Sequence, residues 1–177
     1  MDFEVSVRNA IPSDAERLAA LGMQVWLHTY AKNGISQDIA SYVLMEFTAA
    51  KMSALLADPS VVVLVAEAAG CLAGYATLQL DMPCPSDSTA TVELATLYIQ
   101  AHFSRQGLGT RLLARAEQAV RDRAGSALWL TVNAHNATAI SFYTAHGYTK
   151  IGTAYFSLGN TQHENHVLVS QAALPEQ

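Results

Sequence analysis

Two strand-like and two helix-like segments alternate in the middle of the chain, and this order constrains the fold more than any other feature. Residues 91–99 have the pattern of a strand, and residues 107–124 that of a helix rich in Leu, Ala and Arg, closed by Gly125. Residues 127–132 form a second strand and residues 137–146 a second helix. The order predicts the α/β class.

The segments on either side are predicted to be hairpins and capped helices. Residues 61–67 and 72–80 flank an Ala69-Gly70 turn, and residues 148–158 and 164–170 form a closing hairpin. Further upstream, the pattern predicts a strand at residues 5–7, a capping box of Ser13 and Glu16 at the start of the first helix, and two helices capped by Ser36 and Thr48. Together these segments predict a mixed sheet with flanking helices.

Length and composition bound the organisation of the chain. The 177 residues are 51% hydrophobic and 14% charged, which predicts one folded domain at residues 1–170 and a C-terminal tail at residues 171–177. No apolar run approaches the ~20 residues of a membrane-spanning helix, and the acidic start lacks the pattern of a secretion signal. We therefore expect a cytoplasmic protein without a membrane partner, in which Cys71 and Cys84 stay reduced.

Positive charge is concentrated in one short segment of an acidic chain whose net charge is −5. Residues 1–104 hold four basic and eleven acidic residues (−7), residues 105–123 five and two (+3), and residues 124–177 one and two (−1). Nucleic-acid binding needs basic groups along many phosphates, so a small phosphorylated ligand is favoured over nucleic acid. The alternative is that the five arginines of residues 105–123 form the solvent-exposed face of a helix.

A glycine-containing turn separates the strand at residues 91–99 from the helix that follows. Its sequence is Ser104-Arg105-Gln106-Gly107-Leu108-Gly109-Thr110. Glycine lets a backbone approach an anion closely, and the first amides of a helix carry a partial positive charge that binds phosphate oxygens. Arg105 and Arg111 would add charge beside a pyrophosphate. An ordinary turn is the alternative, because the third glycine of a dinucleotide fingerprint and the Gly-Lys-Ser/Thr of a mononucleotide loop are both absent.

A second segment makes the assignment more specific. Residues 136–148 read Asn-Ala-Thr-Ala-Ile-Ser-Phe-Tyr-Thr-Ala-His-Gly-Tyr. With the glycine turn, this segment resembles the GNAT superfamily of acetyl-coenzyme A-dependent N-acetyltransferases, whose members carry an Arg/Gln-x-x-Gly-x-Gly/Ala loop and a later Asn-x-x-Ala-x-x-Phe-Tyr-x-x-x-Gly-Phe/Tyr helix. The resemblance covers about residues 60–170 and departs at Ser104, where the family usually has arginine or glutamine. It implies a single-domain fold whose mixed, mostly antiparallel sheet is splayed at its centre, with acetyl-coenzyme A as cosubstrate.

The resemblance also implies roles for particular residues. The backbone at the strand end would pair with the pantetheine arm, the glycine turn would hold the pyrophosphate, and an asparagine would bond the far side of the arm. These cofactor-binding residues are Leu97, Tyr98, Ile99, Arg105, Gln106, Gly107, Leu108, Gly109, Thr110 and Asn136. Tyr143 would lie near the thioester sulfur, and Tyr30, at the end of the first helix, would belong to the acceptor pocket.

Two side chains are candidates for proton transfer. A tyrosine hydroxyl of pKa ~10 can protonate the thiolate that leaves when acetyl is transferred, and this is the role expected of Tyr143. An alkyl ammonium of pKa ~10.4 is almost entirely protonated at neutral pH, so a base helps to free the attacking amine. Glu93, six residues before Ile99, is the candidate base, and several family members place a glutamate at about this offset. The alternative is a solvent-facing glutamate at a strand edge.

The predicted acceptor is the primary amine of a small, cationic molecule, because the acidic residues 1–104 would steer a cation. Residues 42–47 and 156–160 loosely resemble the spermidine/spermine-acetylating branch, so a polyamine is one candidate beside amino acids, antibiotics and peptide amino termini. No metal is expected, since His163 and His166 have no further ligand at suitable spacing. Pairing of a sheet edge would allow a homodimer.

Two other classes of function are alternatives to an enzyme. A non-catalytic module would bind acyl-coenzyme A and sense it without turnover. A nucleotide-binding regulatory domain would be stabilised by adenine nucleotides to the same degree as by coenzyme A. The missing phosphate-binding lysine argues against this class.

Overall fold

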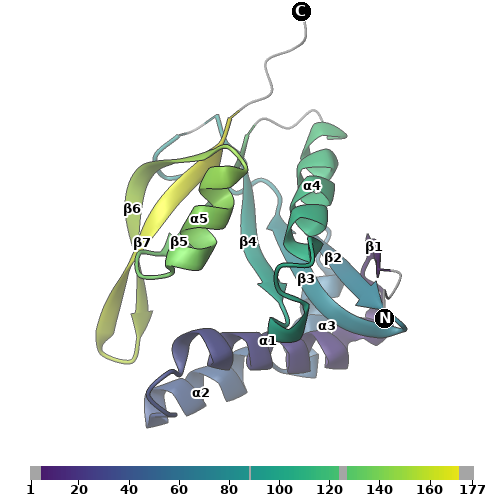
Figure 1. The fold of residues 1–177 in the computed structure, drawn as a ribbon, viewed down its shortest axis with the longest axis vertical. Helices are drawn as coiled ribbons and strands as arrows, with labels where there is room; N and C mark the ends of the chain where they lie inside the picture. Colours follow the sequence, from purple (N-terminus) through teal and green to yellow (C-terminus); the bar gives the residue numbers. More distant parts are fainter. Residues whose placement is uncertain (1–4, 88, 124–126, 172–177) are drawn as a thin grey trace, which may run out of the picture. The chain divides into compact units, whose positions relative to one another are not determined.

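The computed structural model describes residues 5–87, 89–123 and 127–171, and it contains a seven-stranded sheet with flanking helices (Figure 1). The strands are β1 (Val5–Asn9), β2 (Val61–Ala68), β3 (Cys71–Gln79), β4 (Val92–Ile99), β5 (Leu128–Asn133), β6 (Tyr148–Leu158) and β7 (Thr161–Ser170). The helices are α1 (Ala15–Tyr30), α2 (Gln37–Glu46), α3 (Ala49–Ala57), α4 (Leu108–Arg121) and α5 (Ala137–Ala145), with 3-10 turns η1 (Pro12–Asp14) and η2 (Ala101–Phe103). The predicted α/β class is confirmed.

The sheet is mixed, as predicted. Its strand order is β1-β2-β3-β4-β5-β7-β6. β1 pairs with β2, β5 with β7 and β6 with β7 in antiparallel fashion, whereas β4 and β5 are parallel. The chain forms two compact units: the first consists of Met1–Leu78 with Thr96–Ala116, and the second of Gln79–Ala95 with Glu117–Gln177.

Local sequence signals explain most element boundaries in the first unit. The Ser36 hydroxyl accepts from the Ile39 N–H at 3.3 Å to cap α2, and Thr48 accepts from the Lys51 N–H at 3.2 Å to cap α3. Both caps were predicted. Ala69 and Gly70 have φ values of 49° and 78°, so the two residues form the tight turn that joins β2 to the adjacent β3. Helix α1 packs against both α2 and α3.

The predicted capping box of Ser13 and Glu16 is wrong. Residues 12–14 form the turn η1, and Asp14 is the residue that precedes α1. Its carboxylate accepts from the Ile11 N–H at 2.9 Å, so it closes η1 and makes no side-chain cap on α1. The spacing of Ser13 and Glu16 fits a cap, but a charged network around Asp14 determines where the helix begins.

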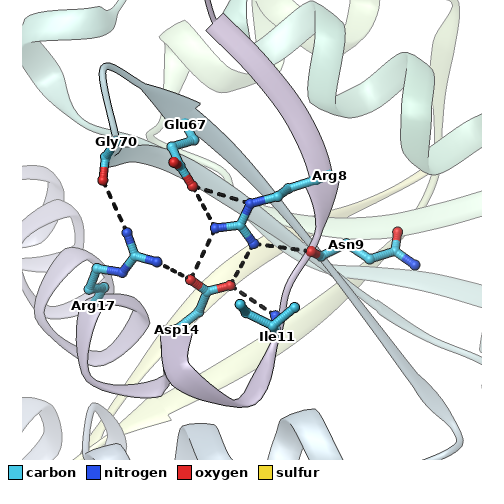
Figure 2. A network of polar contacts seen from close by, with 7 residues as sticks. All are labelled: Arg8, Asn9, Ile11, Asp14, Arg17, Glu67 and Gly70. Carbon is cyan, nitrogen blue, oxygen red and sulfur yellow. Dashed lines mark hydrogen bonds and ion pairs between the residues drawn. The ribbon is translucent and has the colours of Figure 1, made fainter.

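This network joins three segments of the first unit (Figure 2). Asp14 is fully buried and pairs with Arg8 of β1 at 2.7 Å and with Arg17 of α1. Arg8 also pairs with Glu67 of β2 at 2.5 Å, and Arg17 donates to the Gly70 carbonyl at 3.2 Å. The hydrogen bond from Arg8 is the largest cause that lowers the pKa of Asp14, to about 2. The carboxylate is therefore ionised and fully paired at neutral pH.

The second unit contains a long hairpin and a short helix. β6 and β7 pair from Tyr148 with Ser170 to Leu158 with Thr161, so β7 begins three residues before the predicted start at residue 164. A bulge between Lys150 and Gly152 shifts the register in β6. Gly147, with φ 84°, follows α5 and reverses the chain into β6, as predicted.

The end of α4 differs from its predicted position, and two other predictions fall outside the described residues. Helix α4 ends at Arg121, not at the predicted residue 124, because Asp122 and Arg123 already form a turn. The predicted cap at Gly125 lies outside the described residues, as does most of the predicted tail at residues 171–177.

Within the described residues, no single helix has the length and apolarity to cross a membrane; α2 and α3 reach this threshold only as a pair bent by 45°. Cys71 is exposed and Cys84 is buried, and both are free thiols.

We predict that Asp14→Asn lowers the free energy of unfolding by about 2–4 kcal/mol at pH 7, because it leaves two guanidinium groups without their buried partner. A lowered carboxyl pKa stabilises the folded state above the unfolded-state pKa of ~3.9, and this stabilisation is lost as the pH falls through about 2. The difference between variant and wild type should therefore shrink between pH 4 and pH 2.5 in urea titrations.

The matched control is Asp81→Asn, an exposed aspartate whose φ of 54° suits asparagine equally well. We expect this control to stay within about 0.5 kcal/mol of wild type. An equal loss for Asp14→Asn at pH 7 and pH 2.5 would contradict the ion-pair explanation.

Candidate functional site

The end of β4 is held in place by its neighbours in the first unit. The Tyr98 ring lies 5.5 Å from Tyr75 and 6.4 Å from Phe47, between centroids. A Cβ at Gly74 would come within 2.7 Å of both the Tyr98 carbonyl oxygen and the Ile99 Cδ1, so only glycine permits this approach of β3 to β4. The backbone of Leu97, Tyr98 and Ile99 therefore has a defined position.

A turn with two left-handed residues connects β4 to α4. After η2, Arg105 has φ 61° and Gly107 has φ 79°, and α4 begins at Leu108. The Arg111 N–H donates to the Gly107 carbonyl at 3.0 Å, and Gln106 donates to the His102 carbonyl at 2.9 Å. The first N–H groups of a helix have no carbonyl partner within the helix, so they point outward at its N-terminus. Space around Gly107 is open, since a Cβ there would meet nothing within 4 Å.

The arginines of residues 105–123 differ in their surroundings. Arg105 is exposed and makes no hydrogen bond or ion pair with the described residues. Arg111 donates to the Val5 carbonyl of β1 at 2.6 Å, so part of its hydrogen-bonding capacity is used within the protein. Arg121 bonds the Gln118 side chain within α4, and Arg123, in the turn after α4, donates to the Ala119 carbonyl. Both are exposed, so the alternative of a solvent-exposed face holds for these two.

Tyr30 belongs to a run of aromatic side chains in the first unit. Its ring lies 5.0 Å from that of Trp26, which lies 4.8 Å from Tyr42. Tyr42 contacts Phe47 at 6.4 Å, and Phe47 contacts Tyr98 of β4. Trp26 is buried and Tyr30 is 42% exposed, so the run reaches from the core at β4 to the surface at the end of α1.

Glu93 lies in the second unit, where β4 meets β5. The parallel pairing consists of Val92 with Leu128 and Glu93 with Trp129. The Glu93 side chain is half-buried and has no hydrogen-bond or ion-pair partner among the described residues. Burial raises the pKa of its carboxyl. A partly desolvated carboxylate without a partner is more basic than a carboxylate that faces solvent. The alternative of a solvent-facing glutamate therefore does not describe Glu93.

Asn136 precedes α5 and caps it. Its Oδ1 accepts from the Ala139 N–H at 3.1 Å, and its own N–H donates to the Asn133 carbonyl at 2.9 Å. The motif that begins with this asparagine therefore has a structural reason, which the sequence analysis missed. The carboxamide nitrogen of Asn136 makes no hydrogen bond with the described residues.

Tyr143 lies two turns further along α5, about 10 Å from Asn136 along the helix axis. It is only 7% exposed, and its ring contacts Phe142 at 5.2 Å and Tyr148 at 5.6 Å. The Tyr148 hydroxyl donates to Glu117 at 3.0 Å. Sequence reasoning missed Tyr148 and Glu117, because their contact joins residues 31 positions apart.

The described residues contain no group of three or more His, Cys, Asp or Glu side chains arranged to hold a metal ion. His166 lies 3.9 Å from Glu164 on the same strand. The sequence-predicted residues thus fall into two sets. Tyr30, Leu97–Ile99 and the turn at residues 105–110 belong to the first unit, and Glu93, Asn136 and Tyr143 to the second.

Residues 23–148, well over half of the chain, match the model of the acetyltransferase (GNAT) family. The chain belongs to this family. An uncharacterized N-acetyltransferase of Lactobacillus delbrueckii subsp. lactis is 26% identical over 93% of this chain and 95% of that protein. An uncharacterized N-acetyltransferase of Mycobacterium bovis is 28% identical over 90% of this chain and 98% of that protein.

Solved GNAT structures share the fold. The PaiA N-acetyltransferase of Thermoplasma acidophilum, in complex with coenzyme A, has a TM-score of 0.78 and 20% identity, covering 95% of this chain and 99% of that one. The ribosomal-protein-S18-alanine N-acetyltransferase of Escherichia coli has a TM-score of 0.69 and 16% identity, covering 98% and 97%. This chain is thus a GNAT N-acetyltransferase, and acetyl-coenzyme A is its cosubstrate.

The cap at Asn136 gives a direct test of its structural role. Asn136→Ala should lower the free energy of unfolding by roughly 1 kcal/mol, because the Ala139 N–H loses its acceptor. Asn136→Ser keeps an acceptor oxygen and should stay within a few tenths of wild type. Chemical denaturation measures both, and equal stability of the two variants would show that the cap contributes nothing.

Proposed function

We propose that this GNAT enzyme transfers acetyl from acetyl-coenzyme A directly to the primary amine of a small, cationic acceptor. The observation that carries the proposal is the turn between β4 and α4, where Arg105 and Gly107 have positive φ and the N-terminus of a 14-residue helix follows. Such a turn offers backbone amides to an anion at close range.

The first set of residues fits the coenzyme. In our proposal, the amides of residues 106–110 bind the pyrophosphate, and the exposed Arg105 guanidinium adds a charge-assisted bond. The open space at Gly107 leaves the backbone accessible to phosphate oxygens. The register of β4 with β5 ends at Glu93, so the backbone of Leu97, Tyr98 and Ile99 is proposed to pair with the pantetheine arm.

Asn136 is proposed to bond the arm from its other side. Its oxygen is already used as a helix cap, so the carboxamide N–H is the group that would donate. Bound acetyl-coenzyme A supplies an acetyl group activated as a thioester. Because that thioester is already reactive, no covalent enzyme intermediate is expected, and positioning of the two reactants supplies much of the rate.

Proton transfers at the acceptor nitrogen and at the thioester sulfur complete the proposed mechanism. Glu93 accepts a proton from the acceptor ammonium, directly or through water, and its raised pKa suits it to this role. Tyr143 donates its phenolic proton to the sulfur of the departing coenzyme A thiolate. The nitrogen attacks the thioester carbonyl, the C–S bond breaks, and the second proton that the nitrogen then loses replaces the one that Tyr143 gave to sulfur. The products are an N-acetyl amide and free coenzyme A, and Glu93 releases its proton to solvent.

The acceptor is proposed on charge and position. Residues 1–104 carry a net charge of −7, which favours a cation. Tyr30 is proposed to line the acceptor pocket, since its exposed ring ends the aromatic run that reaches β4. A polyamine is one candidate acceptor within this class. A homodimer and a cytoplasmic location stay predictions.

Glu93→Gln should lower kcat/KM at neutral pH by about 10²–10⁴-fold, the usual contribution of a general base. In the wild type, kcat/KM should also fall on the acid side through the raised pKa of Glu93, because only the ionised carboxylate accepts a proton. The variant should lack this acid limb. Exposed Glu16→Gln is the control, and a retained acid limb in Glu93→Gln would assign the base elsewhere.

Calorimetric titration tests the anion-binding turn. We expect Arg105→Gln to weaken acetyl-coenzyme A binding about 5–10-fold, because it removes one charge-assisted hydrogen bond. Arg121→Gln, which removes an equal charge at the other end of α4, should have little effect. No heat with wild-type protein, or equal losses in both variants, would refute the proposed turn.

The acceptor is found by following thiol release from acetyl-coenzyme A with panels of polyamines, amino acids, aminoglycosides and peptides. We expect turnover with a small primary amine and none with its N-acetylated form. Binding of acetyl-coenzyme A without turnover on any amine would instead favour the acyl-coenzyme A sensor.

A further inference from the structure

A buried tyrosine lies directly beside Tyr143 in the second unit. Tyr148 is the first residue of β6, and only His146 and Gly147 separate it from α5. It is 2% exposed. Its ring centroid is 5.6 Å from that of Tyr143, with an interplanar angle of 59°. Its hydroxyl donates to Oε1 of Glu117 in α4 at 3.0 Å. A buried hydroxyl is therefore fixed against the helix that precedes β5.

The hydrogen bond between Tyr148 and Glu117 has one possible direction. The Glu117 carboxylate can only accept, so the Tyr148 hydroxyl is the donor. Ser170, the cross-strand neighbour of Tyr148 in β7, accepts at its Oγ from the Leu128 N–H of β5 at 2.9 Å. The phenolic proton of Tyr148 is therefore committed to Glu117.

This arrangement also keeps Tyr148 neutral. Burial and the nearby Glu117 carboxylate both raise the pKa of its hydroxyl. A tyrosine whose proton is held by a carboxylate is a poor donor to a leaving group. Of the two neighbouring tyrosines, Tyr148 is thus the structural one, and its hydroxyl connects β6 to α4 beside the ring of Tyr143.

We propose that Tyr148, held by Glu117, is a positioning residue for Tyr143. The inference rests on the proposed role of Tyr143 as proton donor. The Tyr143 ring is buried and contacts Phe142 on its own helix and Tyr148 on β6. Holding Tyr148 by its hydroxyl fixes the surface against which the Tyr143 ring rests. Proton donation depends on sub-ångström placement, so a loosened Tyr148 lowers kcat without weakening cofactor binding.

The experiment begins with Tyr148→Phe, which keeps the ring and removes only the hydroxyl. We expect kcat to fall about 5–10-fold while the Kd of acetyl-coenzyme A changes less than twofold. Glu117→Leu should act in the same way, and Glu117→Gln should restore most of kcat because its amide oxygen still accepts the hydrogen bond. Tyr155→Phe, an exposed tyrosine of the same strand, is the matched control. Circular dichroism and the melting temperature check that each variant is folded at the assay temperature.

A double-mutant cycle with Tyr143→Phe decides whether Tyr148 acts through Tyr143. If it does, Tyr148→Phe lowers kcat in the wild type but has no effect on kcat in the Tyr143→Phe background. An equal fold-loss in both backgrounds, or an unchanged kcat in folded Tyr148→Phe, overturns the inference and leaves Tyr143 as donor. An unchanged kcat in Tyr143→Phe alone refutes the donor role itself, and the inference with it.

Discussion

Backbone hydrogen bonding of β4 is the constraint on which the remaining structure depends. One edge of β4 is taken by β3, but its parallel register with β5 covers only Val92 and Glu93. Main-chain N–H and C=O groups need hydrogen-bond partners. The groups of β4 beyond Glu93 that face β5 must therefore bond water or a ligand. Gly74 fixes β4 against β3, and the turn with positive φ at Arg105 and Gly107 then starts α4. In our proposal, both features bind the extended coenzyme and its charged end.

Two carboxyl groups show how tertiary surroundings set opposite chemistry. Asp14 is fully buried but meets two arginines, and the hydrogen bond from Arg8 lowers its pKa to about 2. Glu93 is half-buried and has no partner among the described residues, so burial raises its pKa. The first carboxylate is a fixed structural charge that joins β1, α1 and β2. The second is suited to exchange a proton, which is why it is the proposed base.

Sequence patterns predicted much of the fold and the identity of the site segments. The caps at Ser36 and Thr48, the Ala69-Gly70 turn and the stop at Gly147 depend on residues within a few positions, and all four are confirmed. The predicted capping box at Ser13 was wrong because Asp14, which pairs with Arg8 and Arg17, precedes α1 in its place. The motif residue Asn136 is a helix cap as well as a proposed cofactor contact, and a motif alone does not separate the two roles.

The sequence by itself determined the α/β class, the glycine turn before a helix and membership in the acetyltransferase family, because each depends on residue types at short, fixed spacing. Tertiary structure decided which side chains are buried, paired or exposed. Arg111 donates to the Val5 carbonyl of β1, Arg105 is exposed, and Tyr148 donates to Glu117 beside Tyr143. Such contacts join segments that lie far apart along the chain, and their energies depend on burial and partner geometry, which one-dimensional spacing does not contain.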